Sequence, residues 1–548
     1  MAAVGPEQRV YRNHGLEDLS KLEEKILKRP ECPHKDPESP WEDPESPPFP
    51  PNMKFEWERY KDDAKFFVGG ASAADIQQGR FGTCYFLAAL AALAEEAPEK
   101  LQALQASVKG MGAFCIRWYP DGELKDTWVD NRYLKNEQGQ TVCAHSEGQT
   151  EMWVALLEKA YAKVMGGYER IFGGSCADAF ADLLGCPALE YNLRMGYHST
   201  IWKALHEAKP EKPKDLESRG QIGYKKVACA SVMGDPIHRF LTLGMTRNIM
   251  WLIRFIYARL HWFLTLCNAQ FLVEYPMNTL YIVGAMIAYF FMFLDTITCG
   301  VIFGFPNGIL FLVYSFICLN TIGLMPMHAY SILDVREVGF MGVCGGVCGK
   351  FVKLRNPWGC MEWKSWYSDK SVCWTLRPRL KKDFELKDEN DGAFWMSLGD
   401  FVTYFDLMHV AHIDPQIVCK RAKAKLTERH AYFYFEVTPK QDGEEEDPIV
   451  YVSATQSRKN KDRRQNLCWK IRLFEAEKEP ESLEDRGLCN GAENDHWTWF
   501  HHVCTPRNKL NPGKYCAYVN SSHGPLPSEI VLGLHYHKPS RRVRFCDL

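Results

Sequence analysis

The sequence predicts an α+β protein in which a region of mixed helices and strands is followed by an all-β region. Apolar runs of helical character begin at Cys84 and span 150–168, whereas 112–134 alternates aromatic and branched residues around a Pro-Asp-Gly turn. From residue 425 to 548, short apolar segments such as "HAYFYFEV" and "PIVYVSATQ" recur at regular spacing. This spacing is typical of a β-sandwich.

Composition narrows the class of protein. A chain of 548 residues is long enough for two to four domains, and a net charge of −2 provides no general attraction for nucleic acid. The 20 cysteines follow no disulfide framework, and the N-terminal sequence lacks the apolar core of a secretory signal. Cys344 and Cys348 lack a second ligand pair for zinc. We therefore expect a cytoplasmic protein with reduced thiols that does not bind nucleic acid.

The chain divides into four predicted parts. Residues 1–40 form an N-terminal tail with one short helix, and 41–210 form a first globular part. A charged linker at 207–221 leads into a second globular part, which is rich in strands and covers 211–410. The all-β region, 425–548, is the fourth part.

An apolar insert at about 237–321 interrupts the second globular part. From position 262 to its end, its only charged residues are Glu274 and Asp295. The spans 277–294 and 308–324 are each about as long as the short end of the membrane-crossing range. Two interpretations compete: a genuine membrane hairpin, or a translated intron, because a T-rich intron encodes mostly Phe, Leu, Ile, Met and Val. The abrupt edges and the absence of lysine from position 262 onward favour the intron.

Cys84 stands where a glycine-bracketed loop meets the first helix. Gly79 and Gly82 allow a tight loop, and we expect Thr83 to cap the helix that Cys84 opens. A helix N-terminus stabilises a thiolate. Gln78 lies six residues upstream, where its amide can donate to an oxyanion beside the Cys84 backbone N–H. The alternative is an inert cysteine buried in an alanine-rich helix.

A base for this thiol is predicted on two later strands. His328 begins the alternating run "HAYSILDVREV", and Asn356 ends the strand in "FVKLRNPWG". Neighbouring strands would let the asparagine oxygen hold one imidazole nitrogen while the other faces the thiol, with Trp358 shielding that bond. The chain order Cys, His, Asn is the one used by papain-like proteases. The alternative for His328 is a satisfied core residue.

Several segments, in this order, resemble the calpains. They are "AKFFVGGASAAD", "DIQQGRFGTCYFLAALAAL", "MWVALLEKAYAKVMGGYE", "HAYSILDVREV", "VKLRNPWG" and "DGAFWMSLGDFVTYFD". The resemblance covers about 41–235 and 322–410 and continues more weakly through 425–548. No EF-hand loop follows, as in the non-classical calpains.

The resemblance implies a papain-like protease core of two subdomains, followed by a C2-like antiparallel β-sandwich. It implies a calcium-dependent cysteine endopeptidase that makes limited cuts in intracellular proteins. In that scheme Cys84 is the nucleophile, His328 the base, Asn356 the orienting residue, Gln78 the oxyanion donor and Trp358 the shielding indole. Protein substrates are the expected partners, and membrane contact is expected only through the C2-like domain or the insert.

The resemblance also implies two calcium ions, one in each subdomain. The positions that match the ligands of the first ion are Val68, Gly70, Asp75 and Glu151. The positions that match the second are Glu362, Asp369, Glu389 and Asp391. A further carboxylate of the family is replaced by Ala393. Carboxylate and carbonyl oxygens are the ligands that calcium prefers.

Three departures from the family pattern lie beside the expected site. Thr83 and Tyr85 replace an acid and an indole on either side of Cys84, and Met327 replaces the glycine before His328. An alternative function follows: a catalytically impaired pseudoprotease that acts as a binding or regulatory module. From Cys84 to His328 the chain runs 244 positions. Without the insert this falls to roughly 159, close to the ~130–150 of papain-like enzymes.

Overall fold

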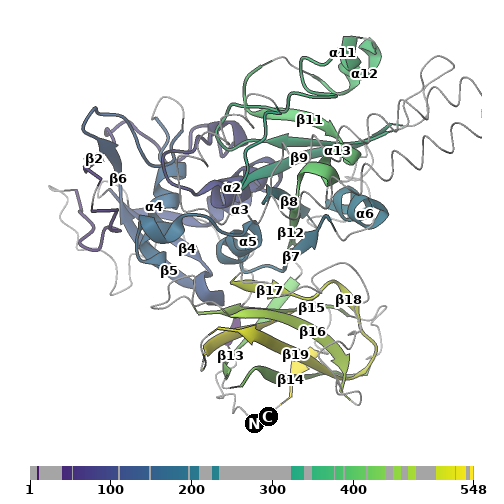
Figure 1. Cartoon of the computed structure of the whole chain (residues 1–548). Coiled ribbons are helices and arrows are strands. Elements are labelled where there is room, and N and C mark those ends of the chain that lie inside the picture. Colours follow the sequence, from purple (N-terminus) through teal and green to yellow (C-terminus); the bar gives the residue numbers. More distant parts are fainter. Residues whose placement is uncertain are drawn as a thin grey trace, which may run out of the picture.

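The computed structural model (Figure 1) describes most of the chain outside the apolar insert. The described residues are 9–11, 40–51, 53–108, 112–146, 150–194, 198–208, 225–233, 322–338, 349–375, 377–386, 389–414, 417–426, 428–439, 448–457, 467–476, 501–524, 526, 528–537 and 543–546. The insert up to residue 321, the pair Cys344 and Cys348, and the helix expected in the N-terminal tail lie outside these residues.

The elements from β2 to β12 form a region of two halves, which we call the protease-like region. Its first half is built around helix α2 (Cys84–Glu96). Every residue from Cys84 to Ala94 is buried, because alanine and leucine side chains let neighbouring elements approach the helix from all sides. The elements around it are α3 (Pro98–Ala103), α4 (Trp153–Met165), α5 (Cys176–Leu184), the sheet β3 (Gln105–Val108), β4 (Ala113–Trp118) and β5 (Lys125–Asp130), and the pair β2 (Phe55–Arg59) and β6 (Arg132–Asn136).

The second half is a six-stranded antiparallel sheet in the order β11-β10-β9-β8-β12-β7. The strands are β7 (Ala188–Asn192), β8 (Lys225–Val232), β9 (His328–Val338), β10 (Gly349–Arg355), β11 (Ala393–Ser397) and β12 (Leu407–Ile413). Side chains alternate between its faces. Cys229 and Ala329 join the core around α2, whereas Ala228 and Tyr330 face the opposite core, which includes α6 (His198–Ala208). The helix α13 (Leu398–Tyr404) also belongs to this half (Figure 1).

The chain enters and leaves the apolar insert at adjacent points of this sheet. Strands β8 and β9 pair antiparallel, and Val232 lies opposite His328 in their register. Directly opposed residues of an antiparallel pair have Cα atoms about 4.5–5.5 Å apart. The insert therefore connects two ends that a short turn would also connect.

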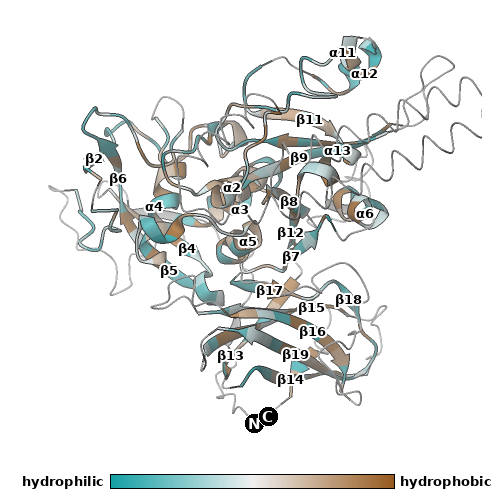
Figure 2. Ribbon diagram, in the orientation of Figure 1, coloured by the Kyte–Doolittle hydropathy of each residue, from teal (hydrophilic) through white to brown (hydrophobic). Residues whose placement is uncertain are grey.

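The C-terminal region consists of two antiparallel sheets with an apolar core between them. One sheet joins β13 (Ile417–Leu426), β15 (Ile449–Gln456), β17 (His502–Cys504), β18 (Asn508–Lys509) and β20 (Ser528–His537), and β1 (Arg9–Tyr11) extends it. The other joins β14 (His430–Val437), β16 (Cys468–Glu475), β19 (Gly513–His523) and β21 (Val543–Phe545). Along these strands apolar and polar residues both occur, as the brown and teal in Figure 2 show. This region begins at Ile417, a few residues before the predicted range.

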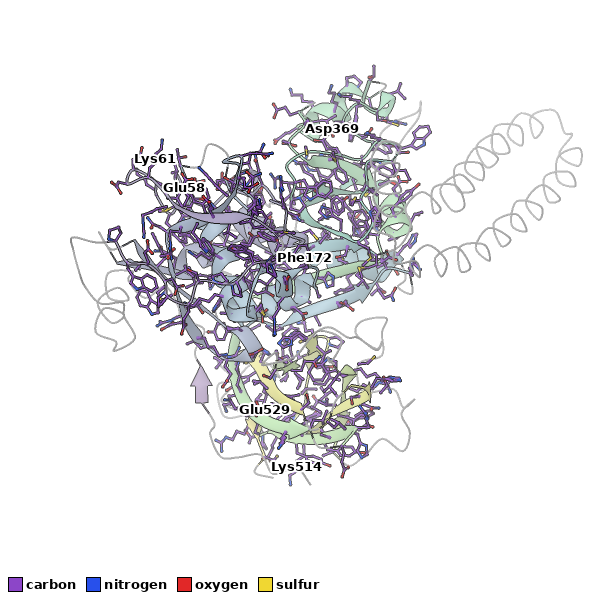
Figure 3. The ribbon with its side chains drawn as sticks, turned by 60° about the vertical axis from the view of Figure 1, so that its left-hand side comes forward. Glu58, Lys61, Phe172, Asp369, Lys514 and Glu529 are labelled. Atoms are coloured by element: carbon purple, nitrogen blue, oxygen red, sulfur yellow. The ribbon has the colours of Figure 1, made fainter. Side chains whose placement is uncertain are left out.

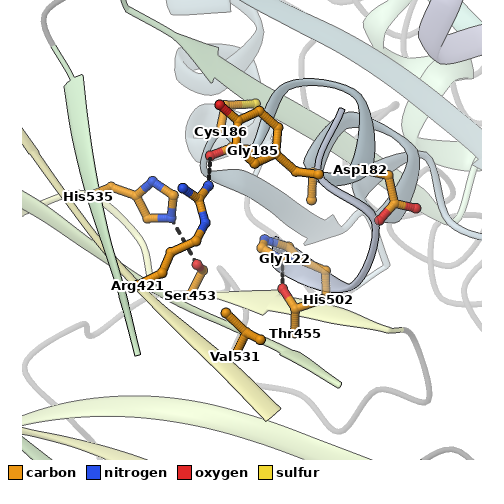
Figure 4. Close-up of a pocket in the computed structure, with 13 residues that line it drawn as sticks. Gly122, Asp182, Gly185, Cys186, Arg421, Ser453, Thr455, His502, Val531 and His535 are labelled. Carbon is orange, nitrogen blue, oxygen red and sulfur yellow. Dashed lines mark hydrogen bonds between the residues drawn. The ribbon is translucent and has the colours of Figure 1, made fainter. Parts of the chain in front are cut away.

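Polar contacts join the C-terminal region to the protease-like region (Figure 4). The Arg421 guanidinium lies 4.7 Å from the Tyr119 ring, and its Nη2 donates to the Gly185 carbonyl over 2.8 Å. The Asp178 carboxylate on α5 accepts from the backbone N–H groups of His501 and His502, over 3.1 and 2.8 Å. These bonds satisfy buried groups on both sides of the junction.

The prediction of an α+β fold is confirmed, since helices and antiparallel sheets are both present. The thirteen described cysteines are free thiols. Among the described residues, no helix combines the length and the apolarity needed to cross a bilayer.

Candidate active site

The loop before Cys84 is held by backbone hydrogen bonds and by a glycine. The N–H of Arg80 donates to the carbonyl of Val142 over 2.8 Å. At Gly79 a Cβ atom would lie 2.2 Å from that same carbonyl oxygen, so only glycine fits. The segment at 142–145, which forms an isolated bridge from His145 to Gln77, therefore sets the position from which α2 starts, and Cys84 is the first residue of that helix.

Thr83 occupies the N-cap position, but its side chain does not cap the helix, so that prediction was wrong. Its hydroxyl donates instead to Glu158 Oε1 over 2.6 Å, and Glu158 Oε2 accepts from the Ala144 N–H over 2.8 Å. Glu158 is fully buried on α4, and burial raises the pKa of its carboxyl to about 7. A buried carboxyl needs donors, and this need outweighs the cap.

His328 and Asn356 meet at the ends of neighbouring strands. His328 begins β9, Asn356 follows β10, and His328 Nε2 lies 2.9 Å from Asn356 Oδ1. The asparagine is fixed by its own amide, which donates to the Met361 carbonyl over 3.1 Å. Because Oδ1 can only accept, Nε2 carries the proton and Nδ1 is left as the basic nitrogen.

Trp358 and Gln78 connect this pair to the loop before Cys84. The Trp358 and His328 ring centroids are 4.8 Å apart, and the Trp358 backbone N–H also donates to Asn356 Oδ1 over 3.1 Å. The indole Nε1–H donates to Gln78 Oε1 over 3.1 Å, and the Gln78 backbone N–H donates to the Pro357 carbonyl over 3.0 Å. Contacts thus link His328, Asn356, Trp358 and Gln78, and the Cys84 thiol lies near the backbone of Ala329, the residue after His328.

The electrostatics of this neighbourhood favour neutral groups. Burial raises the pKa of the Cys84 thiol to about 12, against a smaller opposing effect from the Ala329 backbone. Burial lowers the pKa of His328 to about 4, and the bond to Asn356 offsets this only in part. Among the described contacts, no hydrogen bond joins the thiol to the imidazole. The structure therefore holds a neutral thiol beside a neutral imidazole rather than an ion pair.

Apolar side chains are exposed beside the site. Met327, directly before His328, is 51% exposed and has a φ of 54°, in the left-handed region that favours glycine. Phe172 is 43% exposed and lies in the middle of the view in Figure 3. A Cβ atom on Gly82 would lie 2.9 Å from its ring. Met327 and Phe172 thus expose apolar surface next to His328 and next to the loop before Cys84.

The first predicted metal site has two carboxylates near each other. The Glu151 carboxylate accepts from the Val68 N–H, and Asp75 Oδ2 accepts from the Ser72 N–H over 2.8 Å. Burial raises the pKa of both carboxyls, and the charge of Asp75 raises that of Glu151 further. A cation between them would remove this repulsion, and the carbonyls of Val68 and Gly70 belong to the same loop. Carboxylate and carbonyl oxygens are the type of ligand that calcium prefers.

In the second predicted site, the described contacts connect only two of the four predicted residues, Glu362 and Asp391. Glu362 Oε1 accepts from the Gly392 N–H over 3.0 Å, burial raises the pKa of Glu362, and the charge of Asp391 raises it further. Glu389 is exposed, and Asp369 lies near the top of the view in Figure 3. Within the described residues, no three acidic, histidine or cysteine side chains form a group that could hold a metal ion at either place.

Sequence reasoning missed two buried charges at the site. Glu158 is one of them. An acidic residue among the apolar positions of the predicted helix at 150–168 could have revealed it. Arg355 is the other: its Nη2 donates to the Ile76 carbonyl over 3.2 Å and to the Ala74 carbonyl over 3.4 Å. Asp75 and Asp391, one from each predicted metal site, both act to raise the pKa of Arg355, although burial lowers it overall.

Comparison with known proteins finds similarity to the calpains. The family model described as "Calpain family cysteine protease" matches residues 39–221 and 315–412, about half of the chain. Human calpain-14 is 28% identical over 385 residues, which is 69% of this chain and 42% of that protein. Human calpain-8 is 29% identical over 358 residues, 64% of this chain and 37% of that protein. A calpain of Schistosoma mansoni is 29% identical over 374 residues, 66% of this chain and 36% of that protein.

The chain spans about two-fifths of the length of these curated relatives. The family match stops at 221 and resumes at 315, so the stretch between falls largely within the apolar insert and its approach. Both matched segments contribute to the neighbourhood built above, one through Cys84 and the other through His328 and Asn356. On this match, the chain belongs to the calpain family of cysteine proteases.

Proposed function

We propose that this protein is a calcium-dependent cysteine endopeptidase of the cytoplasm that cleaves other proteins by a Cys-His-Asn mechanism. Family membership supports a cysteine protease. The observation that carries the mechanism is the bond between His328 Nε2 and Asn356 Oδ1, because it leaves Nδ1 as the nitrogen that accepts a proton from the thiol. Free thiols suit the cytoplasm.

In the proposed reaction, His328 Nδ1 takes the thiol proton as Cys84 Sγ attacks the scissile carbonyl carbon. The developing oxyanion is met by the Cys84 backbone N–H and by an amide hydrogen of Gln78. One hydrogen of that amide already binds the Phe81 carbonyl over 2.8 Å, which aims the side chain and leaves the second hydrogen for the oxyanion. His328 then returns the proton to the leaving amine, and water hydrolyses the acyl-enzyme.

Calcium is needed in this mechanism because, without it, the site favours a neutral thiol and a neutral imidazole. With a thiol pKa near 12 and an imidazole pKa near 4, the ion pair is disfavoured in the described arrangement. A cation held by Asp75 and Glu151, with the carbonyls of Val68 and Gly70, would act on the loop that ends at Cys84. We propose that this action brings the thiol and Nδ1 together, with the weaker second site assisting.

The test is covalent labelling of the full chain with a thiol-directed epoxide, with peptide mapping, at several pH values. Without calcium we expect slow labelling of Cys84 that rises only toward alkaline pH, because the thiolate is scarce below a pKa of about 12. Calcium should move this rise toward neutral pH. His328→Ala and Asp75→Ala should each remove the effect of calcium, whereas Asp391→Ala should weaken it less.

The pseudoprotease remains the second candidate, because no described hydrogen bond joins the thiol to the imidazole and a bulky, exposed Met327 directly precedes His328. It predicts that calcium leaves the labelling profile of Cys84 unchanged and that His328→Ala has no effect on it. Labelling spread evenly over the thirteen described cysteines would favour the same conclusion.

A further inference from the structure

A tip of the second half, made of the described residues between 364 and 386, lies at one end of the molecule. It includes the turns at 365–371 and two short helices, α11 (Val372–Thr375) and α12 (Pro378–Asp383). Figure 1 shows both helices at the top of the view, beyond β11, whereas the C-terminal region lies at the bottom. The tip is therefore a surface separate from the C-terminal sheets and from their junction with the protease-like region.

An aromatic cluster beneath the tip decides which of its side chains face outward. Leu380 and Phe384, one helical turn apart, are both buried. They belong to a cluster with Phe351, Trp374 and Trp395. The Phe384 ring centroid lies 4.6 Å from that of Trp395 and 5.3 Å from that of Trp374. Because one face of α12 is anchored in this way, the side chains on its other faces project into solvent.

The outward side chains of α12 are cations. Arg379, Lys381 and Lys382 are all exposed. Within the part of the chain that the structure describes, none of the three side chains makes an ion pair or a hydrogen bond. From 364 to 386 the sequence has six basic and three acidic residues. The tip is therefore positively charged at neutral pH, although the whole chain has a net charge of −2.

Two large apolar side chains are exposed on the same tip. Val372, the first residue of α11, is 60% exposed, and Trp366 is 46% exposed. Backbone bonds close the turns between them: the Ser371 N–H donates to the Ser368 carbonyl over 2.8 Å, and the Trp374 N–H to the Ser371 carbonyl over 3.1 Å. Helix α11 in turn packs against α12. Exposed apolar side chains rimmed by polar ones are typical of an interaction surface.

Cations together with exposed apolar side chains match the chemistry of an anionic membrane surface. Acidic lipid headgroups attract lysine and arginine, and the layer beneath them accepts apolar and indole side chains. A purely acidic protein segment would pair with the cations but would leave Val372 and Trp366 in water. The composition of the tip therefore favours a lipid surface over an acidic protein partner.

We propose that the tip binds the surface of an anionic membrane. Arg379, Lys381 and Lys382 lie among the headgroups, and Val372 and Trp366 enter the layer below them. The contact is peripheral, because it uses side chains on the surface of the fold. It requires neither the apolar insert nor peptidase activity.

The experiment measures how the full chain sediments with vesicles of phosphatidylcholine, with and without phosphatidylserine. The test variant is Lys381→Gln with Lys382→Gln. The matched control is Lys61→Gln with Lys514→Gln, which removes two exposed charges at positions that Figure 3 shows away from Asp369 of the tip. We expect phosphatidylserine to strengthen binding, and the test variant to weaken it about thirtyfold, because each cation lost near an anionic surface weakens binding severalfold. The control should bind as the unmodified chain does, and high salt should weaken binding.

Val372→Ser tests the apolar part of the contact, and Met53→Ser, at an exposed position before β2, is its control. We expect only Val372→Ser to weaken binding, by severalfold. Unchanged binding of this variant would show that Val372 does not enter the membrane.

Equal losses from the two charge variants would overturn the proposal. Binding that does not depend on phosphatidylserine, or no binding at all, would overturn it too. Binding of the unmodified chain to polyglutamate, weakened by the test variant and with none to the vesicles, would assign the tip to an acidic protein partner instead.

Discussion

At the residue scale, the buried Glu158 both stabilises the fold and holds the residue that precedes the proposed nucleophile. One oxygen binds the hydroxyl of Thr83, directly before Cys84, and the other binds the Ala144 N–H. If Thr83 or Glu158 were replaced by a smaller apolar residue, a buried polar group that this residue now binds would be left unsatisfied. This explains why an uncharged threonine suits a position where the family has an acid: a second carboxylate would face Glu158 at close range.

The first prediction concerns the pH dependence of that contact. The pKa of Glu158 is about 7 in the folded chain and about 4.5 when unfolded, so its favourable contribution is present below pH 4.5 and is lost as pH rises through 7. Glu158→Gln keeps an acceptor for Ala144 and cannot ionise. We expect this variant to gain stability relative to the unmodified chain between pH 5 and 8, by on the order of 3 kcal/mol. Urea unfolding of both proteins at pH 5 and at pH 8 measures the difference in the free energy of unfolding.

Glu158→Ala is the contrasting variant. It removes both acceptors and should cost about 2–4 kcal/mol at pH 5. The cost should be smaller at pH 8, because the unmodified chain has by then lost the contribution of the neutral carboxyl. A difference between Glu158→Gln and the unmodified chain that does not change with pH would show that the carboxyl does not titrate in this window.

Met327 leads to a second prediction at this scale. Its φ of 54° costs a non-glycine residue roughly 1 kcal/mol, and its exposed side chain stands before His328. We expect Met327→Gly to leave stability unchanged or slightly raised and to increase kcat/KM severalfold on a protein substrate. Glu385→Gly, at an exposed position with a φ of 48°, is the control for backbone relief alone. Equal changes in kcat/KM from both variants would contradict a steric role for Met327.

At the scale of elements, the end of β10 joins the two halves of the protease-like region. Arg355 donates to the carbonyls of Ala74 and Ile76 in the first half, and Asn356, the next residue, holds His328 in the second. A shift of the 74–76 segment is therefore transmitted to the residue that orients the imidazole. A displacement of about 1 Å in such a site can cost on the order of a hundredfold in rate.

The third prediction tests this connection. Arg355→Met removes the bonds to both carbonyls, and we expect calcium-stimulated labelling of Cys84 to fall at least about tenfold, with a loss of about 1–3 kcal/mol in stability. Lys353→Met is the matched control, since it lies two residues earlier on β10 and its side chain projects from the same face. If both variants lower labelling equally, the effect belongs to the strand and not to the Arg355 bonds.

At the scale of the whole molecule, the topology of the second half explains how it tolerates an apolar insert. Val232 and His328 are register partners, so the sheet closes whether the chain between them is long or short. Removing 237–321 leaves a connection of about ten residues, within the ordinary range of lengths. The family match also resumes only at 315.

The fourth prediction is that a chain lacking 237–321 folds with an unchanged unfolding temperature and keeps the Cys84 labelling profile of the full chain. Thermal unfolding and peptide mapping measure both. If the insert is translated intron, transcripts should mostly join the codons near Gly234 to those near Gly323. If it is a membrane hairpin, the full-length protein should resist carbonate extraction and the long transcript should dominate. Failure of the shortened chain to fold would show that the insert is part of the structure.

Local patterns were sufficient for much of this protein. The Ala-Leu run predicted α2 beginning at Cys84, the segment at 150–168 predicted α4, and the alternation after His328 predicted β9. These are short-range signals, set by side-chain spacing and propensity along one element. The order of the cysteine, histidine and asparagine in the chain, with the motifs around them, likewise placed the chain in its family.

Only the tertiary structure decided which groups are charged and which partners they have. Thr83 looked like a helix cap, yet Glu158, 75 residues away, takes its hydroxyl. Arg355 reaches Ile76 across 279 positions. The pKa values of about 12 for Cys84 and about 4 for His328 come from burial, which is a property of the packed molecule. Spacing along a chain predicts neighbours within an element, whereas long-range contacts and the loss of water depend on how the elements pack.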